Sequence, residues 1–324
     1  MNKIALILFS GGIDSQIAKL LIAEQNIPYE LITFYHGFND KDFNNVKKYF
    51  KDEPITFLDI TERFVRERLF TPKYNYGKGF NPCRDCHQLM TEIAWEYGLK
   101  KYGEGNFFLV TGEVVGQRPN SQRFDTLRHK NPSLMEQYTL RPLSAKVLPE
   151  TIPEKKGWVN RDKLLGIVGK SRKIQMDYIK KYQLYNLTSP GCWLAQKDIK
   201  KRMINIKNIF GSEFDAQDVI AMRYGRHFKL SEKDLLVVSR NESETNKLLN
   251  YKGNKFILLN NIVIGPVGLL SSHSISDDNI VKKAFEIILA YSKAEDNAIY
   301  EYILNGKNYS VKKKDKKEFA DMLL

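Results

Sequence analysis

The residues of this chain whose types could do chemistry are three cysteines, Cys83, Cys86 and Cys192. Two of them form a C-x-x-C pair in residues 81–87, Asn-Pro-Cys-Arg-Asp-Cys-His, on an expected loop beside a proline, and Gly191 precedes the third. An odd number of cysteines argues against a disulfide framework. We therefore expect these thiols to bind a metal, to carry sulfur, or to be buried as small apolar groups.

A short turn, Ser10-Gly11-Gly12-Ile13-Asp14-Ser15, lies between an apolar run at residues 4–9 and a helix-like stretch at residues 16–21. Glycines let the backbone approach an anion, and the start of a helix offers unpaired N–H donors. The turn has neither the Walker spacing nor the G-x-G-x-x-G spacing. It predicts a phosphate site of another kind.

Short apolar runs alternate with helical stretches around this turn. The expected strands cover residues 29–35, 55–60 and 106–112, and the expected helices cover 42–50, 62–69 and 85–97. Such alternation predicts a parallel sheet with helices on both faces and a ligand at the carboxyl ends of the strands. The turn lies at such an end, as do Phe34 and Thr111.

The turn resembles the S-G-G-x-D-S loop of the PP-loop ATP pyrophosphatases, with all five fixed positions present. The resemblance implies an α/β, adenine nucleotide alpha hydrolase-like domain that splits ATP to form an adenylate. The pyrophosphate would be held by Ser10, Gly11, Gly12 and Ser15, and Asp14 would act beside Mg²⁺. Phe34 and the pair Thr111-Gly112 would line the adenine and ribose pocket.

The cysteines allow four interpretations. Cys83-x-x-Cys86-His87 matches a c-type haem attachment motif, although no export segment is visible. A zinc ion could be held by the three cysteines with His87. Buried, unligated thiols are a third interpretation. The fourth is a similarity, shared with the loop, to the tRNA-thiolating PP-loop enzymes, in which an adenylated base oxygen is replaced by sulfur.

In this last interpretation the catalytic residues are Asp14, Cys83, Cys86 and Cys192. Sulfur could travel as a persulfide on Cys192, with Cys83 or Cys86 resolving the bond as a disulfide. Alternatively, all three cysteines could hold a 4Fe-4S cluster as its metal ligands. We favour the cluster because it uses every cysteine.

Two further segments are expected near these sites. Gln117, Arg118, Ser121 and Gln122 come from a glycine-containing segment after an expected strand, and they could bind phosphate, hold the sulfur site, or only connect elements. Residues 169–173, Gly-Lys-Ser-Arg-Lys, are interpreted as a second phosphate contact or as the start of a basic helix. We expect Lys170 or Arg172 to contact phosphate of ATP or RNA.

The composition shifts after Cys192, and we expect a domain of residues 1–205 followed by a smaller α+β domain of residues 206–324. A helix over 197–210, a helix over 213–224 and short strands are expected there. Motifs between residues 222 and 300 resemble the NFACT-R domain, a module associated with RNA. Several cations of this domain could contact the RNA backbone, or they could only be solvated. They are Arg226, His227, Arg240, Lys293 and the run Lys312-Lys313-Lys314.

The net charge of +13 fits a polyanionic partner. No apolar stretch has the length of a membrane span, so we expect a cytoplasmic protein. The expected partners are tRNA and a sulfur donor, either a protein persulfide or sulfide; the oligomeric state is not indicated. A PP-loop ligase that forms amide bonds, an RNA-binding or ribosome-binding ATPase, and a desulfurising enzyme are the rival functions.

Overall fold

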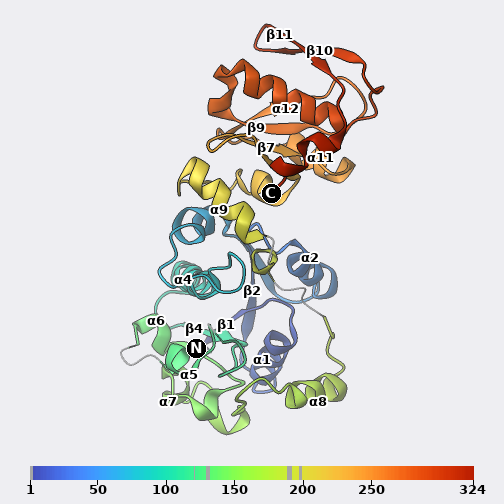
Figure 1. The fold of residues 1–324 in the computed structure, drawn as a ribbon. Coiled ribbons are helices and arrows are strands. Elements are labelled where there is room, and N and C mark those ends of the chain that lie inside the picture. The colour runs from blue at the N-terminus through green and yellow to red at the C-terminus, as the bar shows by residue number, and fades with distance from the viewer. Residues whose placement is uncertain (1–2, 120, 129–131, 188–191, 197–198) are drawn as a thin grey trace. The chain divides into compact units, whose positions relative to one another are not determined.

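The computed structural model describes residues 3–119, 121–128, 132–187, 192–196 and 199–324. The chain divides into two compact units, Met1–Ala195 and Gln196–Leu324 (Figure 1). The division precedes the expected boundary after residue 205 because helix α9 (Ile199–Phe210) is bonded to the second unit. The guanidinium group of Arg202 in α9 donates to the backbone carbonyls of Met222, Arg223 and Gly225.

The first unit contains a five-stranded parallel sheet in the order β3-β2-β1-β4-β5. Its strands are β1 (Ile4–Leu8), β2 (Tyr29–Tyr35), β3 (Ile55–Asp59), β4 (Phe107–Thr111) and β5 (Thr139–Leu140). In the register of the sheet Leu8 faces Ile32 on one side and Thr111 on the other, so β1, β2 and β4 end at one edge. The expected α/β class is confirmed.

Helices connect these strands. The first unit has α1 (Ile13–Ala23), α2 (Asp40–Tyr49), α3 (Thr61–Phe64), η1 (Val65–Leu69), α4 (Cys83–Tyr102), α5 (Phe124–Arg128), α6 (Leu134–Gln137), η2 (Ala145–Val147), α7 (Ile152–Lys155), η3 (Arg161–Lys163), α8 (Lys173–Tyr182) and η4 (Trp193–Ala195). Helix α4 begins at Cys83, directly after Pro82 at the N-cap. The expectation that the C-x-x-C pair lies on a loop is therefore wrong, because proline at a helix start leaves the following turn helical.

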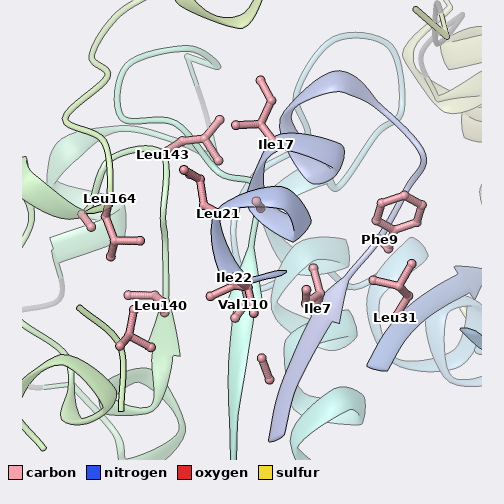
Figure 2. Packing of buried hydrophobic residues seen from close by; sticks show 14 of the residues in the cluster. Ile7, Phe9, Ile17, Leu21, Ile22, Leu31, Val110, Leu140, Leu143 and Leu164 are labelled. Atoms are coloured by element: carbon pink, nitrogen blue, oxygen red, sulfur yellow. The ribbon is translucent and has the colours of Figure 1, made fainter. Parts of the chain in front are cut away.

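The core beside the parallel sheet explains why β1 and α1 are held firmly. Figure 2 shows Ile7 of β1 and Val110 of β4 beneath Ile17, Leu21 and Ile22 of α1. Each of these five side chains is at most 2% exposed. Burial of this apolar surface fixes the turn that joins β1 to α1, because both of its ends belong to the core.

The second unit has a four-stranded antiparallel sheet in the order β6-β7-β9-β8 and a separate hairpin of β10 and β11. Its elements after α9 are α10 (Val219–Arg223), β6 (Arg226–Lys229), β7 (Leu235–Val238), α11 (Glu242–Leu249), β8 (Phe256–Leu259), β9 (Gly268–Ser271), η5 (Ser272–Ser276), α12 (Asp278–Ala290), β10 (Ile299–Leu304), β11 (Lys307–Lys312) and η6 (Lys316–Met322). The apolar face of α12 packs in the core of this unit.

Helix α10 is shorter than the expected helix over 213–224. The Asp215 carboxylate accepts hydrogen bonds from the backbone N–H groups of Gln217 and Asp218, which makes a local turn in place of a helix. The first two residues of the expected helix over 197–210 lie outside the described part of the chain, and α9 covers the remainder. None of the described helices combines the length and the apolar character that crossing a membrane requires.

Candidate functional site

The phosphate loop, residues 10–15, joins β1 to α1 at the carboxyl edge of the parallel sheet. Gly11 has a φ of 74°, in the left-handed region that favours glycine. Gly12 is the N-cap of α1, and no side chain caps the helix there, which leaves the first-turn N–H groups for an anion. Ser10 is exposed, and the Ser15 hydroxyl donates to the Gly12 carbonyl at 2.8 Å. This geometry suits a phosphate group.

Phe34, Thr111 and Gly112 lie at the same edge of the sheet. A Cβ atom at Gly112 would lie 2.7 to 2.9 Å from backbone atoms of Asp14 and Ser15, so only glycine lets the end of β4 pack against the phosphate loop. The Phe34 side chain is 6% exposed and belongs to the core. Only the backbone at Phe34 can therefore face a nucleotide.

Asp14 is held by two amide side chains. Gln117 Nε2 donates to Asp14 Oδ2 at 2.7 Å, and Gln175 Nε2 donates to Asp14 Oδ1 at 3.3 Å. Arg172, which is exposed just before α8, has its guanidinium group 4.0 Å from Asp14 Oδ2. Lys170 is also exposed, in the segment that leads to α8. The segment before α8 therefore brings a cation to the phosphate loop.

The C-x-x-C pair presents one accessible and one buried sulfur. Cys83, at the first position of α4, is half-buried, and its Sγ donates to Ser121 Oγ at 3.8 Å. Cys86 is 7% exposed. All three cysteines, including the half-buried Cys192, are reduced thiols.

A chain of charged groups extends from Cys83. His87 lies one helical turn further along α4, and its Nδ1 lies 3.5 Å from Glu113 Oε1. The other oxygen of Glu113 accepts from Arg141 Nε at 3.0 Å and from the Thr111 hydroxyl at 3.1 Å. A thiol, an imidazole and a carboxylate in this order resemble the arrangement that activates nucleophiles in enzymes.

Electrostatics make Cys83 the more acidic thiol. Burial alone would raise its pKa, but the hydrogen bond and charge of His87, with the charge of Arg118, lower the pKa to about 7. Burial would lower the pKa of His87, and contacts with Cys83 and Glu113 raise it to about 10. Burial, with the charges of Cys192 and Cys83, raises the pKa of the Cys86 thiol well above its ordinary value.

Cys192 is joined to the C-x-x-C region through its neighbours. The backbone N–H of Phe80 donates to the Leu194 carbonyl at 2.8 Å, and the ring of Trp193 stacks on Phe38 at a centroid distance of 5.8 Å. The influence of Cys192 on the Cys86 pKa reflects the same proximity. Gly191, expected to turn the chain before the sulfur, lies outside the described residues.

Glu113 and Arg141 were not among the predicted site residues, and His87 entered only the haem and zinc interpretations of the cysteines. The spacing of Cys83 and His87, four residues apart on a helix, is a signal that could have shown the pair. Glu113 and Arg141 come from different segments, so only the fold brings them to His87.

The side chains of the described residues do not form a ligand group for a single metal ion. Among the described residues, which include all three cysteines, no group of three or more His, Cys, Asp or Glu side chains could hold a metal ion. The 4Fe-4S cluster expected on Cys83, Cys86 and Cys192 stays a prediction.

The parallel sheet with a glycine-rich phosphate loop at its carboxyl edge gives the first unit a PP-loop-like α/β architecture. Among curated proteins, a tRNA-specific 2-thiouridylase MnmA of Chlamydia abortus is 28% identical over 155 residues, 43% of this chain and 42% of the relative. Another MnmA, of Amoebophilus asiaticus, is 25% identical over 243 residues, 66% of this chain and 60% of the relative. The chain thus spans about 42 to 60% of the length of these relatives. These matches confirm the predicted resemblance to the thiolating PP-loop enzymes, at low identity and over part of each chain.

Residues 225–321 match the family model described as the NFACT protein RNA binding domain, which confirms the predicted resemblance of the C-terminal part. A solved structure, the C-terminal part of the fibronectin/fibrinogen-binding protein from Streptococcus suis, aligns at 11% identity over 48% of this chain and 79% of that chain. Its TM-score of 0.26 is too low to support an argument.

The cations expected to meet RNA in the second unit differ in accessibility. His227 is 0% exposed and Lys313 is 8% exposed, so neither can contact RNA, contrary to expectation. The Lys313 ammonium donates to the carbonyls of Leu289, Ala290 and Ser292 at the end of α12.

The other cations of this set divide into exposed and paired side chains. Lys293 and Lys312 are exposed. Lys314 is paired with Glu286, and Arg240 with Glu244. Arg226 is half-buried, with its guanidinium group 4.9 Å from the centroid of the Tyr291 ring.

Proposed function

We propose that this protein is an ATP-dependent, AMP-forming tRNA sulfurtransferase. The observation that carries the proposal is that the phosphate loop and the thiols of Cys83, Cys86 and Cys192 belong to one folded unit. The similarity to proteins named tRNA-specific 2-thiouridylases and the match to an RNA-binding domain support tRNA as the substrate. A cytoplasmic location remains a prediction.

ATP would adenylate a base carbonyl oxygen, and the phosphate loop would bind the phosphates with Mg²⁺ beside Asp14. Mg²⁺ would neutralise phosphate charge there, and a carboxylate oxygen is a suitable ligand for it. The carboxylate of Asp14 keeps its orientation through Gln117 and Gln175. Thr111 and Gly112, with the backbone at Phe34, would border the nucleoside, and Arg172 or Lys170 would contact phosphate.

Sulfur would be carried as a persulfide on Cys192, supplied by a persulfide donor. Its terminal sulfur attacks the base carbon, and AMP leaves with the electron pair of the C–O bond. The thiolate of Cys83 then attacks Cys192 Sγ, which breaks the S–S bond to the base, releases the thiolated base and leaves a Cys83–Cys192 disulfide. A thiol reductant must restore both cysteines. The accessible Cys83 suits this role better than the buried Cys86.

The predicted 4Fe-4S cluster is the alternative sulfur carrier. Because the described residues hold no group that could bind a metal, no step is derived through it. Anaerobic purification followed by an absorption spectrum separates the two routes: an iron-free, colourless protein that still thiolates tRNA supports the persulfide, and a brown protein that loses activity with its iron supports the cluster.

The function is tested with the Cys192→Ala variant, tRNA, ATP and a persulfide donor. We expect thionucleoside formation to fall by about a hundredfold or more, because the sulfur carrier is lost. Mass spectrometry of tRNA nucleosides and measurement of AMP are the readouts, and binding of an ATP analogue confirms that the variant is folded. Unchanged turnover would contradict the sulfur role and favour a PP-loop ligase.

The rival function, that of an RNA-binding ATPase without sulfur transfer, is tested in cells. A strain that lacks this protein should lose a thionucleoside from its tRNA, and a plasmid with the natural sequence should restore it, whereas one with Cys192→Ala should not. An unaltered thionucleoside profile would favour the binding protein. A thionucleoside that accumulates would favour the desulfurising enzyme.

A further inference from the structure

The segment that follows β4, residues 112–119, contacts the phosphate loop. Gly112 packs directly against the backbone of Asp14 and Ser15, where a Cβ atom would come within 2.9 Å. Gln117 Nε2 donates to Asp14 Oδ2 at 2.7 Å. We call residues 112–119 the post-β4 segment.

The same segment reaches the sulfur site. Glu113, next to Gly112, lies 3.5 Å from His87 Nδ1, and His87 follows Cys83 by one turn of α4 and lowers the pKa of its thiol. Ser121, just beyond the segment, accepts from Cys83 Sγ at 3.8 Å. Side chains that are close neighbours in sequence therefore alternate between the nucleotide site and the Cys83 thiol.

The backbone of the segment is fixed between these contacts. The Gly116 N–H donates to the Gln122 carbonyl at 2.6 Å, and the Val115 N–H donates to Ser144 Oγ at 3.0 Å. The Val115 side chain is 3% exposed. The Gln122 N–H also donates to the Arg118 carbonyl at 3.2 Å, so the two hydrogen bonds of Gln122 tie the segment to the residue next to Ser121 and would carry a displacement at Gln117 to it.

A buried side-chain oxygen beside Asp14 has no hydrogen-bond partner among the described residues. Gln175 is 0% exposed, and within the described part of the chain its Oε1 accepts no hydrogen bond. Its Nε2 is shared between Asp14 and Gln117. Magnesium and phosphate would take up oxygen positions of Asp14 and change the donors that Gln117 and Gln175 can offer, and a buried unpaired acceptor favours such a rearrangement.

We propose that the post-β4 segment couples occupancy of the nucleotide site to the reactivity of the Cys83 thiol, with Gln117 as the positioning residue at the nucleotide end and Ser121 at the thiol end. The coupling rests on the proposed ATP site, but it does not depend on sulfur transfer. As a consequence of the coupling, the Cys83 thiol is brought into its reactive arrangement when ATP is bound.

The coupling is measured as the rate of alkylation of Cys83 by iodoacetamide at one pH, with and without Mg²⁺ and an ATP analogue that has a methylene group between the α and β phosphorus atoms. Trypsin cleaves after Arg84, so Cys83 and Cys86 fall in different peptides and mass spectrometry follows each thiol separately. We expect the analogue to raise the rate at Cys83 by about fivefold or more, the lower range of typical coupling.

Gln117→Leu and Ser121→Ala should each bring this ratio to near one, and the double variant should behave like either single variant, because both act through one segment. Gln137→Leu is the matched control: Gln137 is exposed and donates to the Pro132 carbonyl, away from both sites, and its ratio should equal that of the natural chain. A thermal shift with the analogue confirms that each variant still binds nucleotide.

Two results would overturn the coupling: a rate at Cys83 that the bound analogue leaves unchanged or lowers in the natural chain, or a full increase that persists in Gln117→Leu. Either result would leave the proposed function standing if the natural chain still thiolates tRNA. Absence of any analogue binding to the natural chain would instead remove the proposed ATP site, and the coupling with it.

Discussion

Cys83 and Cys86 lie on the same helical turn, yet their surroundings give the two thiols different chemistry. Cys83 is hydrogen-bonded to Ser121 and His87, and its pKa is lowered to about 7 against the opposing effect of burial. Cys86 is buried, and burial keeps its pKa well above the ordinary value. At neutral pH a large share of Cys83 is therefore thiolate, the form that attacks sulfur, while Cys86 stays protonated.

Replacement of His87 tests this difference. Burial opposes ionisation of Cys83, and His87 is the largest influence that lowers its pKa, so His87→Gln should move the midpoint of its alkylation profile upward. We expect the rate at pH 7.5 to fall by about tenfold, which corresponds to an upward shift of about one and a half pKa units. The pH dependence of iodoacetamide labelling at Cys83 is the measurement.

His273→Gln is the control for this variant, because His273 is an exposed histidine of the second unit. Its profile should match that of the natural chain. An unmoved midpoint in His87→Gln would show that the thiolate does not depend on the imidazole.

At the scale of elements, the ends of helices and strands carry the features that position side chains. The phosphate loop ends β1 and begins α1, and α4 begins with the C-x-x-C pair. In the second unit the side chain of Lys313, the residue after β11, caps the end of α12, because its buried ammonium donates to three carbonyls there. A lysine from a basic run thus stabilises the fold and is not available to contact RNA.

The role of Lys313 predicts a loss of stability. Lys313→Met leaves buried carbonyls at the end of α12 without a donor, and we expect the free energy of unfolding to fall by about 1–3 kcal/mol. Chemical denaturation is the measurement. Lys312→Met, at the exposed neighbouring position, is the matched control and should change stability by less than about 0.5 kcal/mol. Equal effects of the two variants would contradict the capping role.

At the scale of the whole molecule, the net charge of +13 and the RNA-binding family match direct attention to exposed cations of the second unit. Lys293 and Lys312 are exposed, whereas the ammonium of Lys307 lies 2.7 Å from Asp278. A lysine that contacts phosphate releases counterions when RNA binds, so its contribution appears in the salt dependence of the affinity.

Lys293→Ala should therefore weaken tRNA binding and reduce the slope of log affinity against log salt by about 1. Fluorescence anisotropy with labelled tRNA at several salt concentrations gives the slope. Lys307→Ala, which removes a lysine already paired with Asp278, should leave the slope nearly unchanged. A slope that Lys293→Ala does not alter would exclude a phosphate contact at this position.

Much of the first unit could be predicted because its signals are local. The apolar run at residues 4–9, the glycines at 11 and 12, and the alternation that follows specify strand, turn and helix without information from elsewhere in the chain. The helix over 213–224 was wrong because the Asp215 side chain competes for the backbone N–H groups there. The position of Asp215 in the sequence does not by itself show which backbone groups its side chain will bind.

The sulfur site could be predicted only in part. The cysteines are visible in the sequence, but the contact of Glu113 with both His87 and Arg141 depends on how β4, β5 and α4 pack. The burial of Lys313 and His227 likewise depends on tertiary packing, so the charge run gave no indication that these cations are inaccessible. The amino-acid composition gives the number of charged side chains, whereas the fold determines which of them are exposed to solvent.

The hydrogen bond between the Phe80 N–H and the Leu194 carbonyl has a consequence for the order of folding. It joins segments that are far apart in the sequence, and such contacts form late because the entropy of closing a long loop must first be offset. A chain still being synthesised carries the C-x-x-C pair long before Leu194 exists. During synthesis the segment that bears Cys192 can therefore join the first unit only after all five strands of the parallel sheet have been made.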